Sequence, residues 1–279
     1  GLNIKINTDE ELLITDKFRP FLHELEIEQP DCVINVKCCD KLPEKLSEEY
    51  RKGLTGFTGN LYRFRNFHYE VNEEITFGAT CMEEKSKLYQ WYLPAYKKYF
   101  QDSAAVFKYI GLESILMCHE RILLHASFIR YKDCGLLFSA PSGTGKSTQA
   151  ELWRKSTGAE VINGDRAALS CENERWIAWG IPYAGTSGIC KNEQVPLGAI
   201  VILRQGVKNR VEKLNCLSAL KYLYPETSMH PWDYDYVDRA MNLLQNLVEN
   251  VPVYLLECLP EESAVKVLQR TLEEEGILK

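Results

Sequence analysis

The sequence contains no apolar run long enough to cross a bilayer, no dense cluster of basic residues and no low-complexity linker. Its most apolar stretch, residues 110–129, is interrupted by charged residues, whereas a membrane-spanning helix needs about 20 consecutive, mostly apolar residues. The formal net charge is −6, and the acidic residues at positions 9–11 do not fit the positively charged start of a signal peptide. We therefore expect neither a nucleic acid nor a membrane as partner, and we expect a cytoplasmic enzyme or binding protein.

The sequence also lacks the Cys-x-x-Cys spacing of common zinc and redox sites, although it has 10 cysteines. A chain of 279 residues can build a core without a disulfide framework, and its hydrophobic content of 45% is typical of globular proteins. Cys134, Cys171 and Cys258 lie in or beside apolar segments. We interpret them as small, buried hydrophobic side chains.

The first 110 residues are predicted to form a strand-rich N-terminal region. Apolar and polar residues alternate there, as in strands with one buried face, over residues 2–6, 33–37 and 61–67, and a further strand is indicated at 75–77. Gly53, Gly56 and Gly59 indicate a turn region between the second and third of these strands.

Residues 111–279 are predicted to form an α/β domain with a mixed sheet, because helical and strand-like patterns alternate along them. The expected strands are residues 123–131, 135–139, 160–163, 167–170, 176–179, 197–203 and 251–256. The expected helices are residues 104–118, 148–156, 217–223, 236–248 and 261–275, with Gly158 ending the second of them.

A strand, a glycine-rich turn and a helix follow one another around residues 140–147, which end in the Gly-Lys-Ser pattern of a P-loop. Its backbone amides and the positive end of the helix would hold phosphates, and Lys146 would reach the β- and γ-phosphates. Ser147 would offer its hydroxyl to Mg²⁺, so we expect ATP and magnesium as ligands. The predicted nucleotide-binding residues are Ser142, Gly143, Thr144, Gly145, Lys146, Ser147 and Thr148.

Two further residues are candidates for the chemistry. Asp165 follows the strand expected at 160–163, where a P-loop enzyme commonly keeps a carboxylate that binds the metal or accepts a proton from the attacking hydroxyl. The alternative is a turn aspartate in Asn-Gly-Asp. His125 lies on the strand before the P-loop strand and would face the phosphates if these strands form a hairpin, while the alternative is a histidine of the core.

Other polar segments are further candidates for the site. Residues 180–188 are rich in glycine and form either a second anion-binding or substrate loop, with Thr186 and Ser187 as donors, or a plain connection. Arg166, Lys191 and Arg204 are candidate phosphate contacts further along the chain.

Residues 125–127, 134–148 and 161–165 together resemble the catalytic domain of HPr kinase/phosphorylase and of related kinases from bacterial peptide-modification clusters. The order of histidine, strand, P-loop, helix and strand-borne aspartate carries the resemblance, which covers about residues 120–205. It implies a phosphoenolpyruvate carboxykinase-type nucleotide fold and transfer of the γ-phosphoryl group of ATP to a hydroxyl. His125, Lys146 and Asp165 would then be catalytic, and the acceptor would be a serine of a peptide or protein, or a small molecule.

The sequence departs from that family at two places. HPr kinases carry two successive aspartates at the strand end, whereas Gly164 precedes Asp165 here. Residues 185–188 stand where the family has an arginine–glycine signature tied to phosphorylase activity, so neither HPr as acceptor nor the reverse reaction is inferred. The alternatives to a kinase are a nucleotide-binding regulatory protein without turnover, which the missing aspartate favours, a carboxykinase-like lyase, which only a shared fold supports, and a P-loop that has lost its ligand.

Overall fold

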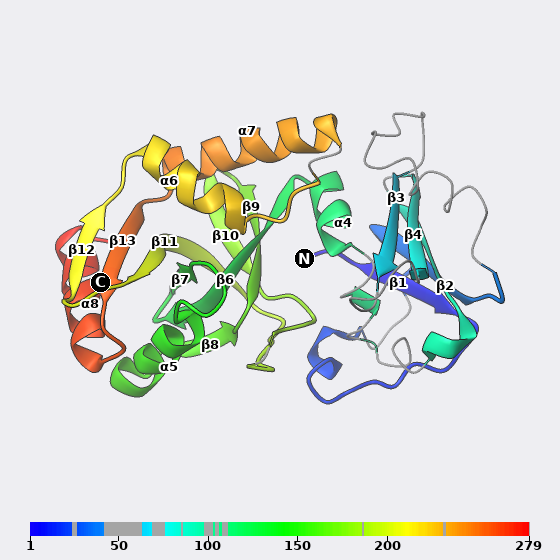
Figure 1. Ribbon diagram of the computed structural model, residues 1–279, viewed down its shortest axis with the longest axis horizontal. Coiled ribbons are helices and arrows are strands. Elements are labelled where there is room, and N and C mark those ends of the chain that lie inside the picture. The colour runs from blue at the N-terminus through cyan, green and yellow to red at the C-terminus, as the bar shows by residue number, and fades with distance from the viewer. Residues whose placement is uncertain are drawn as a thin grey trace. The chain divides into compact units, whose positions relative to one another are not determined.

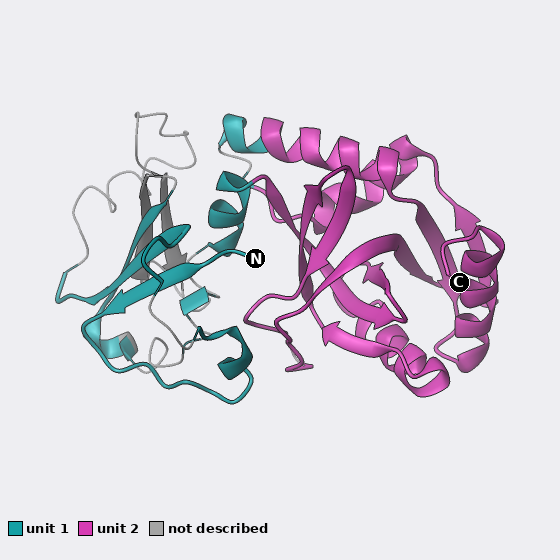
Figure 2. Ribbon diagram, turned by 180° about the vertical axis from the view of Figure 1, so that it is seen from behind, with its two compact units in different colours: residues 1–119, 230–237 teal, residues 120–229, 238–279 magenta. Residues whose placement is uncertain are grey.

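The computed structural model describes residues 1–23, 27–41, 63–68, 76–84, 86–97, 103, 106–107, 111–185, 187–230 and 233–278. The chain divides into two compact units, unit 1 (residues 1–119 and 230–237) and unit 2 (residues 120–229 and 238–279), which Figure 2 colours separately. The two domains expected from the sequence, with a boundary after residue 110, stay a prediction, because compactness does not show that a part folds alone. Among the helices that the structure describes, none combines the length and apolar character needed to cross a membrane.

Unit 1 is built on a five-stranded sheet with the strand order β1-β2-β5-β4-β3. Strands β1, β2, β3 and β4 are labelled in Figure 1. The pairs β1–β2 and β2–β5 are parallel, and the pairs β5–β4 and β4–β3 are antiparallel. The strands are β1 (Ile4–Thr8), β2 (Cys32–Cys38), β3 (Arg63–His68), β4 (Thr76–Glu84) and β5 (Lys87–Tyr92). The helical elements are η1 (Arg19–Phe21), η2 (Pro94–Tyr96) and α4 (Leu112–Cys118).

Strand β5 is the strand of the described part of unit 1 that the sequence did not indicate. Leu88, Gln90 and Tyr92 are buried on one face of it, while Tyr89 and Trp91 alternate with them and stack with ring centroids 5.5 Å apart. Large rings therefore occupy both faces of the strand, and the alternation of apolar and polar residues is hidden.

Several expectations fall partly on residues that the structure does not describe. The turn at Gly53, Gly56 and Gly59 lies outside the described residues, as do the first two residues of the strand expected at 61–67. The helix expected over residues 104–118 is described in part, and α4 forms its C-terminal end.

Unit 2 is a mixed α/β unit with an eight-stranded sheet in the order β10-β9-β6-β7-β11-β13-β12, with β8 also paired to β6. Strand β10 pairs with β11 as well as β9, so the pairings among β6, β7, β11, β10 and β9 form a closed cycle. The strands are β6 (Arg121–Tyr131), β7 (Cys134–Ser139), β8 (Glu160–Asn163), β9 (Arg166–Glu172), β10 (Arg175–Trp179), β11 (Gln194–Gln205), β12 (Arg210–Lys213) and β13 (Val253–Cys258). The helical elements are α5 (Lys146–Thr157), α6 (Cys216–Leu223), η3 (Tyr224–Glu226), α7 (Tyr234–Asn250), whose first residues 234–237 are counted in unit 1, and α8 (Glu262–Glu274).

The expected mixed α/β architecture is therefore present in unit 2. The continuous apolar strand expected at 197–203 is the middle of β11, which lies between β7 and β13 and runs parallel to both. Helix α5 ends at Thr157, and the next residue, Gly158, has the left-handed φ of 74° that a glycine after a helix commonly supplies. Strand β12 was not expected, because its four residues are mostly charged and exposed at the sheet edge.

The cysteine interpretation needs one correction. Cys171 is exposed on β9, and Cys134 and Cys258 are only half-buried, whereas all three were expected inside. Cys171 lies near the end of its strand, beyond the part whose side chains are buried.

Trp153 lies at the centre of the core that positions helix α5. Its side chain is fully buried in a cluster formed by β7, β11, β13 and α8. Its ring meets Tyr131 edge-on at 5.5 Å between centroids and lies 6.2 Å from the ring of Phe138. Because α5 begins at Lys146, this packing also fixes the residues at the start of the helix.

We predict that Trp153→Ala lowers the free energy of unfolding by about 3–5 kcal/mol, because it leaves a large cavity. Trp153→Phe should cost clearly less, since it keeps most of the packing and removes a buried indole N–H that has no hydrogen-bond partner among the described residues. Urea unfolding of the three proteins measures both effects. Equal losses for the two substitutions would contradict this account.

Candidate active site

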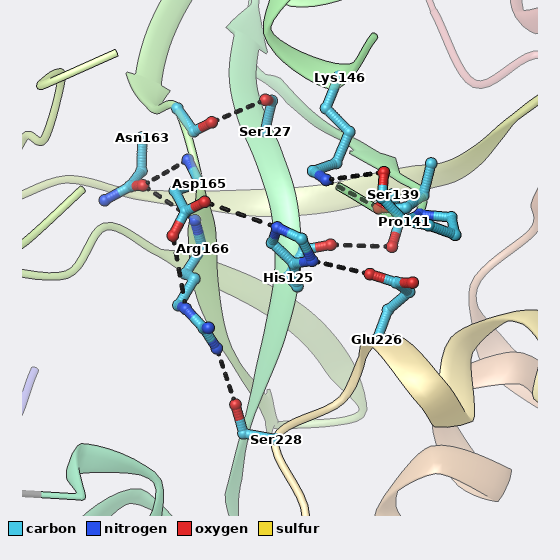
Figure 3. Close-up of polar contacts among 12 residues, drawn as sticks. His125, Ser127, Ser139, Pro141, Lys146, Asn163, Asp165, Arg166, Glu226 and Ser228 are labelled. Carbon is cyan, nitrogen blue, oxygen red and sulfur yellow. Dashed lines mark hydrogen bonds and ion pairs between the residues drawn. The ribbon is translucent and has the colours of Figure 1, made fainter. Parts of the chain in front are cut away.

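Strands β6 and β7 form the expected hairpin, paired from Ala126 and Ser139 to Tyr131 and Cys134. His125 precedes the first of these pairs, and the Ser139 hydroxyl donates a hydrogen bond of 2.9 Å to the His125 carbonyl oxygen. The hairpin therefore holds His125 beside the point where β7 runs into the glycine-rich loop (Figure 3).

Residues 140–145 connect β7 to α5. Gly143 and Gly145 have φ angles of 80° and 119°, which side chains with a Cβ rarely adopt. No atom lies within 4 Å of a Cβ built at either position, so glycine is required here by the backbone conformation and not by lack of space. The exposed tip of this loop includes the expected phosphate contacts Ser142 and Gly143.

Lys146 is the first residue of α5, and its side chain turns back toward the loop. Its ammonium group donates hydrogen bonds of 2.7 Å to the Ala140 carbonyl and 3.5 Å to the Pro141 carbonyl (Figure 3). Burial lowers the pKa of Lys146, and the negative charges of Glu226 and Asp165 oppose this effect. Thr144 and Gly145 are half-buried, whereas Ser147 and Thr148 are exposed.

Asp165 lies in a sharp turn between β8 and β9 that is held by Asn163. The fully buried side-chain oxygen of Asn163 accepts hydrogen bonds from the backbone N–H groups of Asp165 at 2.9 Å and Arg166 at 3.0 Å. The Ala126 N–H donates to the Asp165 carbonyl at 2.9 Å, and the Ser127 hydroxyl donates to the Gly164 carbonyl at 2.9 Å. The turn is thus tied to the same strand that carries His125.

His125 lies between two carboxylates. Its Nδ1 is 2.7 Å from Oε2 of Glu226, and its Nε2 is 3.5 Å from Oδ1 of Asp165 (Figure 3). The second distance is long for a hydrogen bond, so the contact with Glu226 is the stronger of the two. When Nε2 is protonated, its contact with Asp165 lowers the pKa of that carboxyl, and the charge of Arg166 adds to this effect, although burial raises the pKa.

Arg166 is the second charged residue that contacts the Asp165 carboxylate, through its own guanidinium group. Its Nε lies 3.4 Å from Oδ2 of Asp165, and its Nη1 donates to the Ser228 hydroxyl at 2.9 Å. Arg166 was a candidate phosphate contact, and the structure brings it to the candidate site. The other two candidates are paired elsewhere: Lys191 with Glu160, and Arg204 with Glu257 at 2.7 Å.

Glu226 is the site residue that sequence reasoning missed. It ends the short helix η3 after α6, and Thr227 forms an isolated bridge with Leu124 of β6. The Ser228 N–H donates to the Leu123 carbonyl at 2.9 Å. No motif surrounds Glu226, so its position follows only from how the chain returns to β6.

The glycine-rich segment at 180–188 lies against the Asp165 turn. The Asn163 amide donates to the carbonyls of Ile181 at 3.3 Å and Tyr183 at 2.9 Å. A Cβ at Gly185 would come within 2.8 Å of Oδ1 of Asp165. The segment therefore approaches the carboxylate closely, while Thr186 lies outside the described residues.

Ser147 and Asp165 as magnesium ligands stay a prediction. Among the described residues, no group of three or more His, Cys, Asp and Glu side chains is arranged to hold a metal ion. Magnesium typically takes one or two protein ligands and completes its octahedron with phosphate oxygens and water. The exposed Ser147 hydroxyl and the Asp165 carboxylate are the residue types that fit such a site.

No protein-family model and no curated protein sequence matches the chain. Among solved structures, the chain is similar to the Hpr(Ser) kinase/phosphatase from Coxiella burnetii, with 16% sequence identity and a TM-score of 0.32. The alignment covers 55% of this chain and 94% of that chain. A TM-score this low carries no argument about function.

We predict that Asn163→Ala lowers the free energy of unfolding by more than about 2 kcal/mol, because it leaves two N–H groups and two carbonyls without their partner. Asn242→Ala, on the exposed side of α7, is the control and should stay within about 0.5 kcal/mol of the wild type. Denaturant unfolding measures both. Similar losses for the two variants would show that the amide does not hold the turn.

We predict a pH-dependent contribution of Asp165 to stability. Because its pKa is lowered in the folded protein, its charge stabilises the fold above the unfolded pKa of about 3.9, and this contribution is lost as the pH falls through the folded value. The difference in unfolding free energy between wild type and Asp165→Asn should therefore be constant above about pH 5 and shrink below about pH 4. A difference that grows on acidification would contradict the assigned direction.

Proposed function

We propose that this protein is a magnesium-dependent phosphotransferase that moves the γ-phosphoryl group of ATP to a hydroxyl group. The observation that supports it is that three groups from different elements come together: Lys146 at the start of α5, His125 on β6 and Asp165 in the turn between β8 and β9. His125 and Asp165 are 3.5 Å apart, and the charge of Asp165 acts on Lys146. An isolated glycine-rich turn would not need a buried ammonium group or a histidine held between two carboxylates.

The loop and Lys146 would bind the nucleotide. The helix start offers unpaired backbone N–H groups and the positive end of its dipole to the phosphates. The ammonium group has three donors, of which two now reach the carbonyls of Ala140 and Pro141. It would keep part of this bonding while donating to the β- and γ-phosphates, so that a buried positive charge meets the charge of the leaving group.

Ser147 and Asp165 would hold Mg²⁺, which supplies charge neutralisation on the β- and γ-phosphates when it is bound. The acceptor hydroxyl would lose its proton to Asp165 or to His125 as the new O–P bond forms. Arg166 would keep the Asp165 carboxylate oriented through its contact at 3.4 Å. The acceptor would be a serine of a peptide or protein, or a small alcohol.

Nucleotide binding without turnover is the second candidate, and Gly164 favours it. A second aspartate at this position would add a Cβ that comes within 1.9 Å of the Ser187 hydroxyl oxygen and 2.6 Å of its Cβ. The turn therefore accommodates one carboxylate unless Ser187 moves. A site with one strand-end aspartate fits a protein that binds Mg-ATP as a signal and does not consume it.

We predict that Mg-ATP at about 100 times its dissociation constant stabilises the wild-type protein by roughly 2.7 kcal/mol and raises its unfolding midpoint by roughly 5 °C or more. Lys146→Ala should abolish this shift, because the buried ammonium group is lost from the phosphate site. Lys155→Ala is the matched control, since it removes an exposed lysine from the same helix, and its shift should equal that of wild type.

Formation of ADP then separates the two candidates. A stabilised wild type that releases ADP, with water or serine-containing peptides as acceptor, supports the phosphotransferase. A stabilised wild type that leaves ATP intact under all these conditions supports the binding protein. Absence of any shift in the folded wild type would remove both.

A further inference from the structure

The hydrogen bond between His125 and Glu226 determines which nitrogen of the neutral imidazole carries the proton. A neutral ring has one N–H, and a carboxylate can only accept. The distance of 2.7 Å from Nδ1 to Oε2 of Glu226 therefore assigns that proton to Nδ1. In this neutral form Nε2 keeps its lone pair and faces Oδ1 of Asp165 from 3.5 Å. Only the charged ring, with a proton on both nitrogens, can donate to Glu226 and Asp165 together.

We propose that Glu226 is a positioning residue that fixes the tautomer and orientation of His125, so that Nε2 is the proton acceptor of the site. This inference rests on the proposed phosphotransferase function and deepens it. The two carboxylates around His125 then have different roles: Glu226 orients the imidazole ring, and Asp165 binds the metal. The same division holds in other enzymes in which a carboxylate behind a histidine sets its tautomer.

The proposed phosphoryl transfer moves one proton and exchanges one P–O bond for another. The O–H bond of the acceptor breaks and its proton moves to Nε2 of His125, while the acceptor oxygen forms a bond to the γ-phosphorus of ATP. The bond from that phosphorus to the β–γ bridging oxygen breaks, and ADP leaves with the electron pair. The imidazolium that results lies between the carboxylates of Glu226 and Asp165, whose charges compensate it.

The surroundings of Glu226 suit a rigid orienting group. Its side chain is 9% exposed, so water competes little for its oxygens. The backbone on its C-terminal side is tied to β6 through Thr227 and Ser228, and the Thr227 hydroxyl donates to the Leu223 carbonyl at 2.8 Å. Its negative charge also acts on the buried Lys146, which links the histidine pair to the loop.

The decisive experiment compares the wild type with Glu226→Gln, Glu226→Asp and the exposed control Glu212→Gln. Nitrogen-15 NMR of labelled histidine reports the tautomer, and His125→Gln assigns the signal among the five histidines. In wild type we expect the neutral ring protonated at Nδ1. Glu226→Gln should lose this preference, because an amide can donate to Nδ1 as well as accept from it.

Turnover of Mg-ATP, measured as ADP formation, gives the functional readout. Glu226→Gln should lower kcat by about 10²-fold or more while leaving the KM for Mg-ATP and the ligand-induced thermal shift unchanged. Glu226→Asp keeps the carboxylate and should recover part of kcat, and Glu212→Gln should match wild type. A protein that folds and binds Mg-ATP normally excludes a purely structural loss.

Two results would overturn the proposal: a wild-type ring protonated at Nε2, or a Glu226→Gln protein with normal kcat. If wild type binds Mg-ATP but forms no ADP, the result contradicts the proposed phosphotransferase function and not the role of Glu226. In that case the NMR spectra still decide whether Glu226 sets the tautomer.

Discussion

The pairing of strand β6 with three other strands is the constraint on which the candidate site depends. Its first half pairs with β9, and its second half pairs with β8 on that side and with β7 on the other. The chain must therefore turn between β8 and β9 opposite the middle of β6, and this turn contains Asp165. A shift of β6 by one residue would place His125 on the opposite face of the sheet, away from both carboxylates.

The site contains buried charged side chains, and burying any one of them without a partner of opposite charge would cost free energy. Lys146 is 7% exposed, and the side chain of Glu226 is 9% exposed. A buried charge is tolerated when partners compensate it, and here each cation lies near a carboxylate. The burial that lowers the pKa of Lys146 is opposed by Glu226 and Asp165, so the two carboxylates beside His125 also favour the charged form of the ammonium group. Functional sites commonly keep such arrangements although they contribute little to stability.

Much of the architecture follows from local patterns, because period and turn chemistry act over a few residues. The alternation in β2, the apolar run in β11 and the glycine that ends α5 all predict the element that forms. The exceptions also have local causes: rings on both faces conceal β5, and charged residues conceal the edge strand β12. For the site, the hairpin that carries His125 and the turn that carries Asp165 could be predicted, since both adjoin recognisable segments. Glu226 could not, because only the tertiary path of the chain brings it to β6.

Glu226 supplies a second carboxylate near the single aspartate that follows β8. Counted along the sequence, Gly164 leaves the turn with one carboxylate where the resembling kinases have two. Counted in space, His125 has two carboxylates as neighbours, one from the turn and one from the segment after η3. The second carboxylate does not reach the same place as a neighbouring aspartate would, because the imidazole lies between it and Asp165. It could therefore act on the proposed reaction only through the ring, which is why we assign it the orientation of His125 and not a second metal contact.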